Sequence, residues 1–233
     1  MRDKKIWIFN AGNAFDGNPK WLFMYIVNYR KDITPYWFCY TEETRNYIRK
    51  LGYQAFLFKS KMAEKIGSQA GVYVVNQKKE VFQDYLKGIT VLNLWHGVGC
   101  KTVEKGVTYG FLNERIIKKH IINMDCYQNY QLFLVTSPLM EKHFIKQCDL
   151  AEDKIIRAGY PCCFYPGKIK TYDHDILKQK KLPEDTKIAV YAPTYRDASA
   201  TNFFSQAIPD MEKLVDVLEK NNFLLIFKMH PLM

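Results

Sequence analysis

The 233-residue sequence lacks the signatures of several large classes of protein. No apolar run reaches the roughly 20 residues that span a bilayer, and the start MRDKKIWIFN does not resemble a secretory leader. The six cysteines include no C-x-x-C pair or other zinc-ligand spacing, so we expect neither a metal site nor a disulfide framework. These absences favour a protein of the reducing cytoplasm.

Sequence motifs for several common ligands are also missing. The chain has no dinucleotide fingerprint, no P-loop and no RNA- or DNA-binding motif, so we do not expect nucleic acid as a partner. A net charge of +10 nevertheless implies anionic binding partners, such as phosphate-bearing substrates or an anionic membrane surface. With 48% hydrophobic residues the chain is not disordered, and its length suits one large domain or two modest ones.

Strand-like and helix-like segments alternate along the first 160 residues. Apolar branched runs predict the strands, while helical spacing, Thr41 as an N-cap and the helix start Ser137-Pro138 predict the helices. The expected strands cover residues 5–9, 34–40, 54–58, 71–75, 89–95, 131–136 and 154–158, and expected helices cover residues 21–29 and 41–52. This alternation predicts an α/β fold with a parallel sheet, a Rossmann-like domain over residues 1–160. For residues 109–123, a membrane-surface helix and a helix buried on several sides both remain open.

A second unit is predicted after residue 160. Residues 165–185 are rich in lysine and contain proline and glycine, which indicates a linker and surface structure. The unit then continues as a strand, a loop, an amphipathic helix and a strand, at residues 187–191, 193–207, 211–218 and 223–227. Because two strands cannot bury both faces of a sheet alone, we expect residues 161–233 to be the truncated start of a second domain.

Three strand-like runs end in polar or charged loops. The first stops at Trp95 and continues as His96-Gly97, the second opens into residues 191–197 (YAPTYRD), and the third into residues 228–231 (KMHP). A lone histidine at a strand end is more often a core residue, but open α/β sheets bind ligands at such ends, so three loops together indicate a site. If the last two strands are neighbours, one crevice receives Thr194, Arg196, Lys228 and His230.

Taken together, the motifs resemble the CDP-glycerol glycerophosphotransferase family, the teichoic acid primases and polymerases and their capsule-forming relatives. In chain order, the motifs that carry the resemblance are Trp95-His96-Gly97, Ser137-Pro138, Gly159-Tyr160-Pro161, residues 191–197 and His230-Pro231. They extend over essentially the whole chain. The resemblance implies a GT-B-like architecture, with two Rossmann-like domains and an active site in the cleft between them. Residues 1–160 would form the acceptor-side domain, and residues 161–233 would begin the C-terminal nucleotide-binding domain.

The activity implied is transfer of glycerol phosphate from CDP-glycerol to a hydroxyl of a lipid-linked or polymer acceptor, with release of CMP, in cell-wall or capsule polymer synthesis. CDP-glycerol is then the donor substrate, and no cofactor is expected. Because such acceptors are lipid-linked, the resemblance also implies a cytoplasmic protein that acts as a peripheral protein at the inner face of the cell membrane. By the same analogy His96 is the general base, a task that suits an imidazole titrating near neutrality. His230 would bind the donor phosphates and stabilise charge on the leaving group.

The resemblance also assigns substrate-binding roles. Arg196 and Lys228 would counter the pyrophosphate charge, and Thr194 would donate its hydroxyl. Gly159 and Tyr160 would shape the nucleotide side of the cleft. The remaining expected substrate contacts are Gly97, Lys101 and Pro161.

The chain departs from the family pattern in two places and leaves alternatives open. Cys162-Cys163-Phe164 stands where family members commonly have Arg-Asn-Asp, and residues 98–101 (VGCK) stand where Thr-Pro-Leu-Lys is frequent. A GT-B transferase with another CDP-alditol or nucleotide-sugar donor therefore remains an alternative, as does an inactive truncated remnant. A hydrolase using Cys100 and His96 is disfavoured, since no third group completes it.

Overall fold

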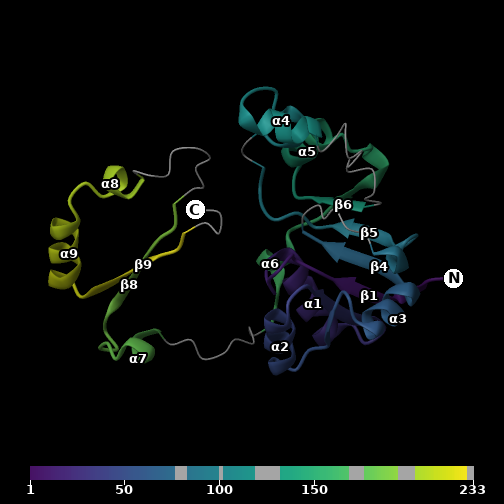
Figure 1. Cartoon of the computed structure of the whole chain (residues 1–233), viewed down its shortest axis with the longest axis horizontal. Coiled ribbons are helices and arrows are strands. Elements are labelled where there is room, and N and C mark those ends of the chain that lie inside the picture. The colour runs from purple at the N-terminus through teal and green to yellow at the C-terminus, as the bar shows by residue number, and fades with distance from the viewer. Residues whose placement is uncertain (77–82, 100–101, 119–131, 168–175, 194–202, 230–233) are drawn as a thin grey trace. The chain divides into compact units, whose positions relative to one another are not determined.

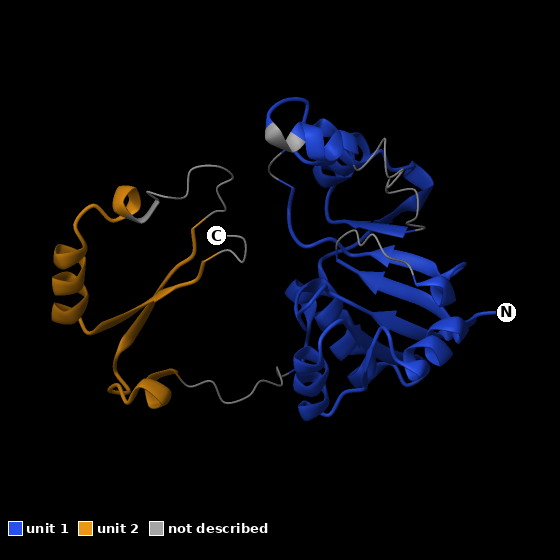
Figure 2. Cartoon of the chain, viewed as in Figure 1, with its two compact units in different colours: residues 1–170 blue, residues 171–233 orange. Residues whose placement is uncertain are grey.

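The computed structural model describes all residues except 77–82, 100–101, 119–131, 168–175, 194–202 and 230–233 (Figure 1). The chain divides into two compact units, residues 1–170 and 171–233 (Figure 2). We expected the boundary after residue 160. The first unit extends further because helix α6 (Pro161–Phe164) packs on α1 (Gly17–Tyr29), and because Asn28 Nδ2 donates to the Tyr165 hydroxyl at 2.8 Å.

The first unit is built on a seven-stranded sheet in which every neighbouring pair is parallel. Its strands are β1 (Asp3–Phe9), β2 (Thr34–Cys39), β3 (Ala55–Leu57), β4 (Ala70–Val75), β5 (Thr90–Asn93), β6 (Leu132–Val135) and β7 (Ile155–Arg157). They follow the order β3-β2-β1-β4-β5-β6-β7. The chain first adds β2 and β3 on one side of β1 and then adds β4 to β7 on its other side, so the strand order reverses between β1 and β4. Ligands of such sheets bind at the carboxyl ends of the strands beside this reversal. The seven strands confirm the predicted series, although β3, β5, β6 and β7 are shorter than expected, and β5 ends at Asn93 instead of Trp95.

Helices connect these strands, and two of them start with the caps that were predicted. The helices of the first unit are α1, α2 (Glu42–Lys50), α3 (Lys61–Gln69), α4 (Phe111–Ile117), α5 (Pro138–Cys148) and α6, with 3-10 turns η1 (Asp84–Leu86), η2 (Glu104–Gly106) and η5 (Glu152–Lys154). The Thr41 hydroxyl accepts the Thr44 N–H, and the Ser137 hydroxyl accepts the Met140 N–H, which satisfies amides that the first turn leaves unpaired.

Two helical predictions need adjustment. α1 begins at Gly17, not at residue 21, so Asn18 and Pro19 lie in its first turn. Residues 109–123 contain α4, while residues 119–123 of that stretch lie outside the described residues. In the described part of the chain, no helix has both the length and the apolarity needed to cross a bilayer.

Apolar side chains fill both faces of the seven-stranded sheet. Because side chains alternate along a strand, Phe9 faces α1 and meets Phe23 edge-on, with ring centroids 5.4 Å apart. Its neighbour Ile8 joins the cluster on the other face, which includes Phe144 of α5. The sheet is thus covered on both sides, as the near-continuous apolar character of its strands requires.

The second unit has a two-stranded parallel sheet of β8 (Lys187–Tyr191) and β9 (Phe223–Phe227). Its helices are α7 (Ile176–Lys180), α8 (Phe203–Ala207) and α9 (Met211–Lys220). Both strands and α9 confirm the prediction. α7 and α8 lie in stretches expected to be linker and loop; each has only five residues, too few for a periodic apolar pattern to stand out.

Candidate active site

The loop that follows β5 has a tightly specified backbone. Its turn places Trp95 at φ 54°, a left-handed conformation that is unusual for a bulky residue. The Trp95 N–H donates to Asn93 Oδ1 at 2.8 Å, and Asn93 is completely buried at the end of the strand. The asparagine side chain therefore supports the strained turn immediately before His96.

Asn18, in the first turn of α1, holds the same loop from the side. Its Nδ2 donates to the Leu94 carbonyl at 3.3 Å and to the Trp95 carbonyl at 3.0 Å. Its Oδ1 accepts the N–H of Cys162 in α6 at 3.4 Å. Since Asn18 is only 3% exposed, these bonds are shielded from water, and one side chain joins three segments that are distant in sequence.

His96 lies on the surface with one ring nitrogen engaged. Its Nδ1 is 3.0 Å from the backbone carbonyl of Asn76, the residue after β4. A carbonyl can only accept, so this contact requires a proton on Nδ1 of His96. The ring stacks on Trp95 with centroids 4.4 Å apart, which also limits its rotation. His96 is thus an exposed imidazole whose ring is held in one orientation.

The Gly-Tyr-Pro motif contacts the His96 loop directly. The buried Tyr160 hydroxyl donates to the Gly97 carbonyl at 2.6 Å. Burial raises the pKa of Tyr160 above its ordinary value, so the phenol keeps the proton that this bond needs. Gly159 precedes it, and any side chain there would collide with the Phe164 ring. Two motifs far apart in the chain therefore form one surface.

Helix α5 supplies further groups beneath the loop. The Gly99 N–H points to Met140 Sδ at 3.2 Å, and the Val103 N–H donates to Gln147 Oε1 at 2.9 Å. A Cβ at Gly99 would lie 2.7 Å from His143 Nε2, so only glycine allows the loop to approach this histidine. The sequence did not predict a role for His143. The one feature that could have indicated it is its position in the helix that follows the Ser137 N-cap.

Several buried polar atoms surround this loop without a hydrogen-bond partner in the part of the chain that the structure describes. They are Asn76 Oδ1, Asn93 Nδ2 and His143 Nε2. Buried polar groups without a partner cost free energy, so each calls for an explanation, such as a bound water or ion. The same feature occurs at Trp37 Nε1, which packs against Phe23 on the α1 side of the sheet, so it is not confined to this edge.

The structure brings together half of the predicted site residues. His96, Gly97, Gly159, Tyr160 and Pro161 lie in the first unit, on the loop after β5 and the segment that enters α6. Lys228 lies exposed in the second unit, where its N–H donates to the Tyr191 carbonyl at 2.9 Å. This bond continues the β8–β9 pairing, so both strands end at the same edge, as predicted. The other four fall outside the described residues and stay predictions: Lys101, Thr194, Arg196 and His230.

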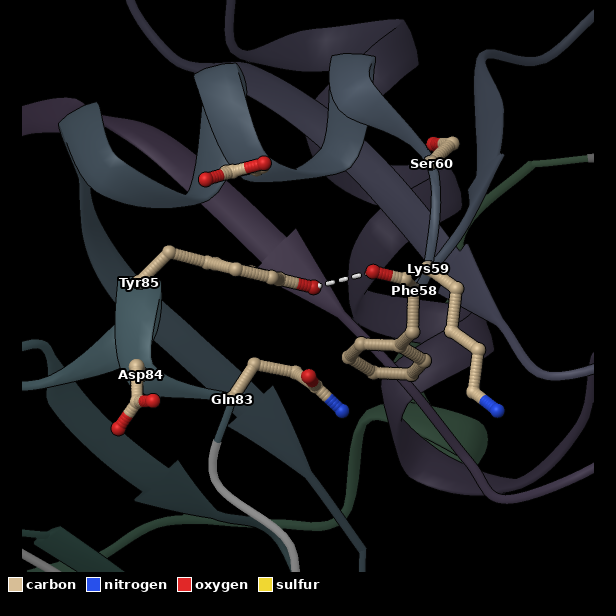
Figure 3. A pocket seen from close by; sticks show the side chains of 7 residues that line it. Phe58, Lys59, Ser60, Gln83, Asp84 and Tyr85 are labelled. Carbon is tan, nitrogen blue, oxygen red and sulfur yellow. Dashed lines mark hydrogen bonds between the residues drawn. The ribbon is translucent and has the colours of Figure 1, made fainter.

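A separate pocket of about 300 Å³ opens after the carboxyl end of β3. It is lined by Phe58, Lys59, Ser60, Glu64, Gln83, Asp84 and Tyr85 (Figure 3). The Tyr85 hydroxyl donates to the Phe58 carbonyl at 2.7 Å, and burial raises the pKa of Tyr85 to about 12, so that bond persists at neutral pH. None of the lining residues belongs to the His96 loop, and the described residues hold no cluster of three or more potential metal ligands.

The complete chain matches one protein family. Residues 1–233 match the family described as CDP-glycerol:poly(glycerophosphate) glycerophosphotransferase. The chain belongs to this family. The resemblance inferred from the ordered motifs is thereby confirmed.

Relatives within the family synthesise teichoic acids, according to their names. The chain is 30% identical over 107 residues to a teichoic acid glycerol-phosphate primase of Bacillus spizizenii, covering 46% of this chain and 27% of the primase. It is 23% identical to a teichoic acid poly(glycerol phosphate) polymerase of the same organism, over 99% of this chain and 60% of the polymerase. The chain thus spans three-fifths or less of the length of these curated relatives.

A solved structure confirms the fold. The wall teichoic acid polymerase TagF superposes with a TM-score of 0.72 at 20% identity, over 99% of this chain and 57% of TagF. This likeness supports the predicted α/β, GT-B-like class, in which a Rossmann-like domain with a parallel sheet precedes the first part of a second Rossmann-like domain.

Proposed function

We propose that the chain belongs to an enzyme that transfers glycerol phosphate from CDP-glycerol to a hydroxyl of a lipid-linked or polymer acceptor in teichoic-acid-type polymer synthesis. Family membership and the names of the relatives support this proposal, as does a solved TagF variant soaked with CDPG. The observation that carries it for this chain is His96, whose Nδ1 is fixed by the Asn76 carbonyl while the ring lies exposed.

In the proposed reaction His96 is the general base. Its Nε2 accepts the proton of the acceptor hydroxyl while that oxygen attacks the phosphorus that bears glycerol. The bond from this phosphorus to the bridging oxygen breaks, and CMP leaves. Because phosphoryl transfer depends mainly on positioning and electrostatics, cationic groups must hold the donor phosphates. Lys228, Arg196 and His230, with the Thr194 hydroxyl, are the proposed phosphate-binding groups.

The proposal includes a place of action. A net charge of +10 supports peripheral contact with the anionic inner face of a cell membrane, where a lipid-linked acceptor would be presented. The reaction needs no cofactor beyond the donor substrate itself.

The test is CMP release from CDP-glycerol in the presence of membrane acceptor. We expect His96→Ala to reduce the rate by about 100-fold or more, the usual contribution of a general base. His174→Ala, in the predicted linker, is the matched control and should keep the wild-type rate. An unchanged rate in His96→Ala would refute the general-base role, and absence of CMP release from the wild-type chain would refute transfer by this chain from this donor.

CDP-ribitol is the second candidate donor. One relative is a teichoic acid ribitol-phosphate primase of Bacillus spizizenii, 23% identical over 70% of this chain. Comparing CMP release from the two donors at equal concentration decides between them. A higher kcat/KM with CDP-ribitol would replace glycerol by ribitol in the proposal and leave the role of His96 unchanged.

A further inference from the structure

Two exposed thiols lie side by side on α6. Cys162 and Cys163 are both free, and their Sγ atoms are 3.8 Å apart. Cys39 and Cys148, by contrast, are buried. Neither thiol takes part in the proposed transfer reaction, so the exposed pair is free to bind a ligand of its own.

The geometry of the pair disfavours two familiar fates of cysteine. The Cα atoms of adjacent residues are about 3.8 Å apart, below the range of about 4.4–6.8 Å that unstrained disulfides require. A zinc site needs three or four protein ligands, and the described residues contain no group of three side chains that could provide them. An internal disulfide and a zinc site therefore both fit poorly.

A single soft atom bound by both sulfurs fits the spacing. Two thiols whose Sγ atoms are 3.8 Å apart are close enough for small side-chain rotations to bring both sulfurs onto one soft atom. We propose that Cys162 and Cys163 together bind one thiophilic atom through their two sulfurs. The ligand class is a trivalent organoarsenical, whose arsenic both sulfurs would coordinate. Such a centre needs two sulfur ligands in addition to its own carbon substituent, so no third protein ligand is required.

The binding step balances without an oxidant. An organoarsenic(III) oxide forms two As–S bonds as two S–H bonds break, and its oxygen leaves with both protons as water. Burial, followed by the hydrogen bond to Cys163, raises the pKa of the Cys162 thiol. The thiol is therefore protonated at neutral pH, which slows reactions that need a free thiolate and leaves the proton for the departing water.

A ligand bound to the two thiols would affect the His96 loop through a single residue, Asn18. The Cys162 N–H donates to Asn18 Oδ1, and Asn18 Nδ2 donates to the Trp95 carbonyl. A ligand that shifts the first turn of α6 therefore acts on the support of His96. This consequence rests on the proposed transferase function, whereas binding at the thiols does not.

The probe is phenylarsine oxide, added to the chain with Cys100 and Cys126 replaced by serine. We expect intact-mass analysis to show one phenylarsenic group per chain and a thiol assay to show the loss of two thiols. The adduct should survive an excess of 2-mercaptoethanol but yield to the dithiol 2,3-dimercaptopropanol. In the same background, Cys162→Ser and Cys163→Ser each keep one exposed thiol and should lose the adduct to 2-mercaptoethanol.

Two results would overturn the proposal: an adduct on the paired chain that 2-mercaptoethanol removes, or equal retention by the single-serine variants. CMP release is measured on the same samples, where we expect at least a tenfold loss with the adduct bound. A stable adduct with undiminished release refutes only the link to the His96 loop. Because mass analysis requires no turnover, failure of the thiol site and failure of the proposed function remain distinguishable.

Discussion

The two units bury their apolar side chains to very different extents. In the first unit, Phe9, Phe23 and Trp37 are completely buried between the sheet and α1. In the described part of the second unit, no large apolar side chain is fully buried, and Val190 is 61% exposed. The strands of both units are rich in apolar residues. What differs is the number of neighbours: a seven-stranded sheet has interior strands, whereas β8 and β9 are both edges.

The same substitution made in both units should expose this difference most clearly. Phe9→Ala removes a ring with no exposed surface and should destabilise the first unit by about 3–5 kcal/mol. Phe227→Ala, at a ring that is 38% exposed, should destabilise the second unit by about 1 kcal/mol or less.

Hydrogen exchange of the strand amides measures each unit separately, which a single unfolding curve for two units does not. We expect faster exchange in β4 of the Phe9 variant and little change in β8 of the Phe227 variant. Equal losses in the two variants would mean that the second unit is packed as tightly as the first.

A matched pair of asparagines repeats the comparison within α1. Asn18→Ala leaves two carbonyls and one N–H without their partners, so we expect a loss of about 1–3 kcal/mol. CMP release should fall about tenfold, mainly through kcat, because His96 remains present but less firmly oriented. Asn28→Ala, on the exposed end of the same helix, removes only a surface bond to Tyr165 and should cost less than about 1 kcal/mol.

Histidine NMR provides a readout that a purely structural role would not change. In the wild type we expect His96 to hold its proton on Nδ1, and in Asn18→Ala we expect a mixture of the two tautomers. A single unchanged tautomer together with normal kcat would contradict the positioning role of Asn18.

The smallest effect should come from an exposed ion pair. A hydrogen bond from Arg30 lowers the pKa of Asp32 from 3.8 to about 2. A lowered pKa in the folded state stabilises the protein above pH 3.8, and this contribution disappears as the pH falls towards 2. Asp32→Asn should therefore lower the urea midpoint of the first unit, which contains all four tryptophans and is followed by their fluorescence, slightly at pH 7 and less at pH 2. Exposed Asp153→Asn, in the same unit, is the control. A shift of equal size at both pH values would contradict the linkage to this carboxylate.

Much of the fold could be predicted because its signals are local. Apolar runs mark the strands, and Thr41 and Ser137 cap their helices through bonds to residues three positions along the chain. The exact end of the first unit could not be predicted, since it depends on the packing of α6 against α1. A short helix such as α8 is stabilised by too few local interactions to be recognised beforehand.

The candidate site was predictable only where chemistry and motif coincide. His96 stands out as a titratable residue after a strand-like run, and the structure places it exposed, three residues after β5 ends. Asn18 and His143 do not stand out, because their roles arise from tertiary contacts with Trp95 and Gly99. Nothing in the sequence near Asn18 indicates that its amide joins the His96 loop to α6.

The interior place of β1 in the sheet has a consequence for the chain as it is synthesised. β2 can pair with β1 as soon as both have left the ribosome, but the opposite edge of β1 stays unpaired until β4 has been made. During that interval the nascent chain presents an open, apolar strand edge, the kind of surface that promotes aggregation and recruits chaperones.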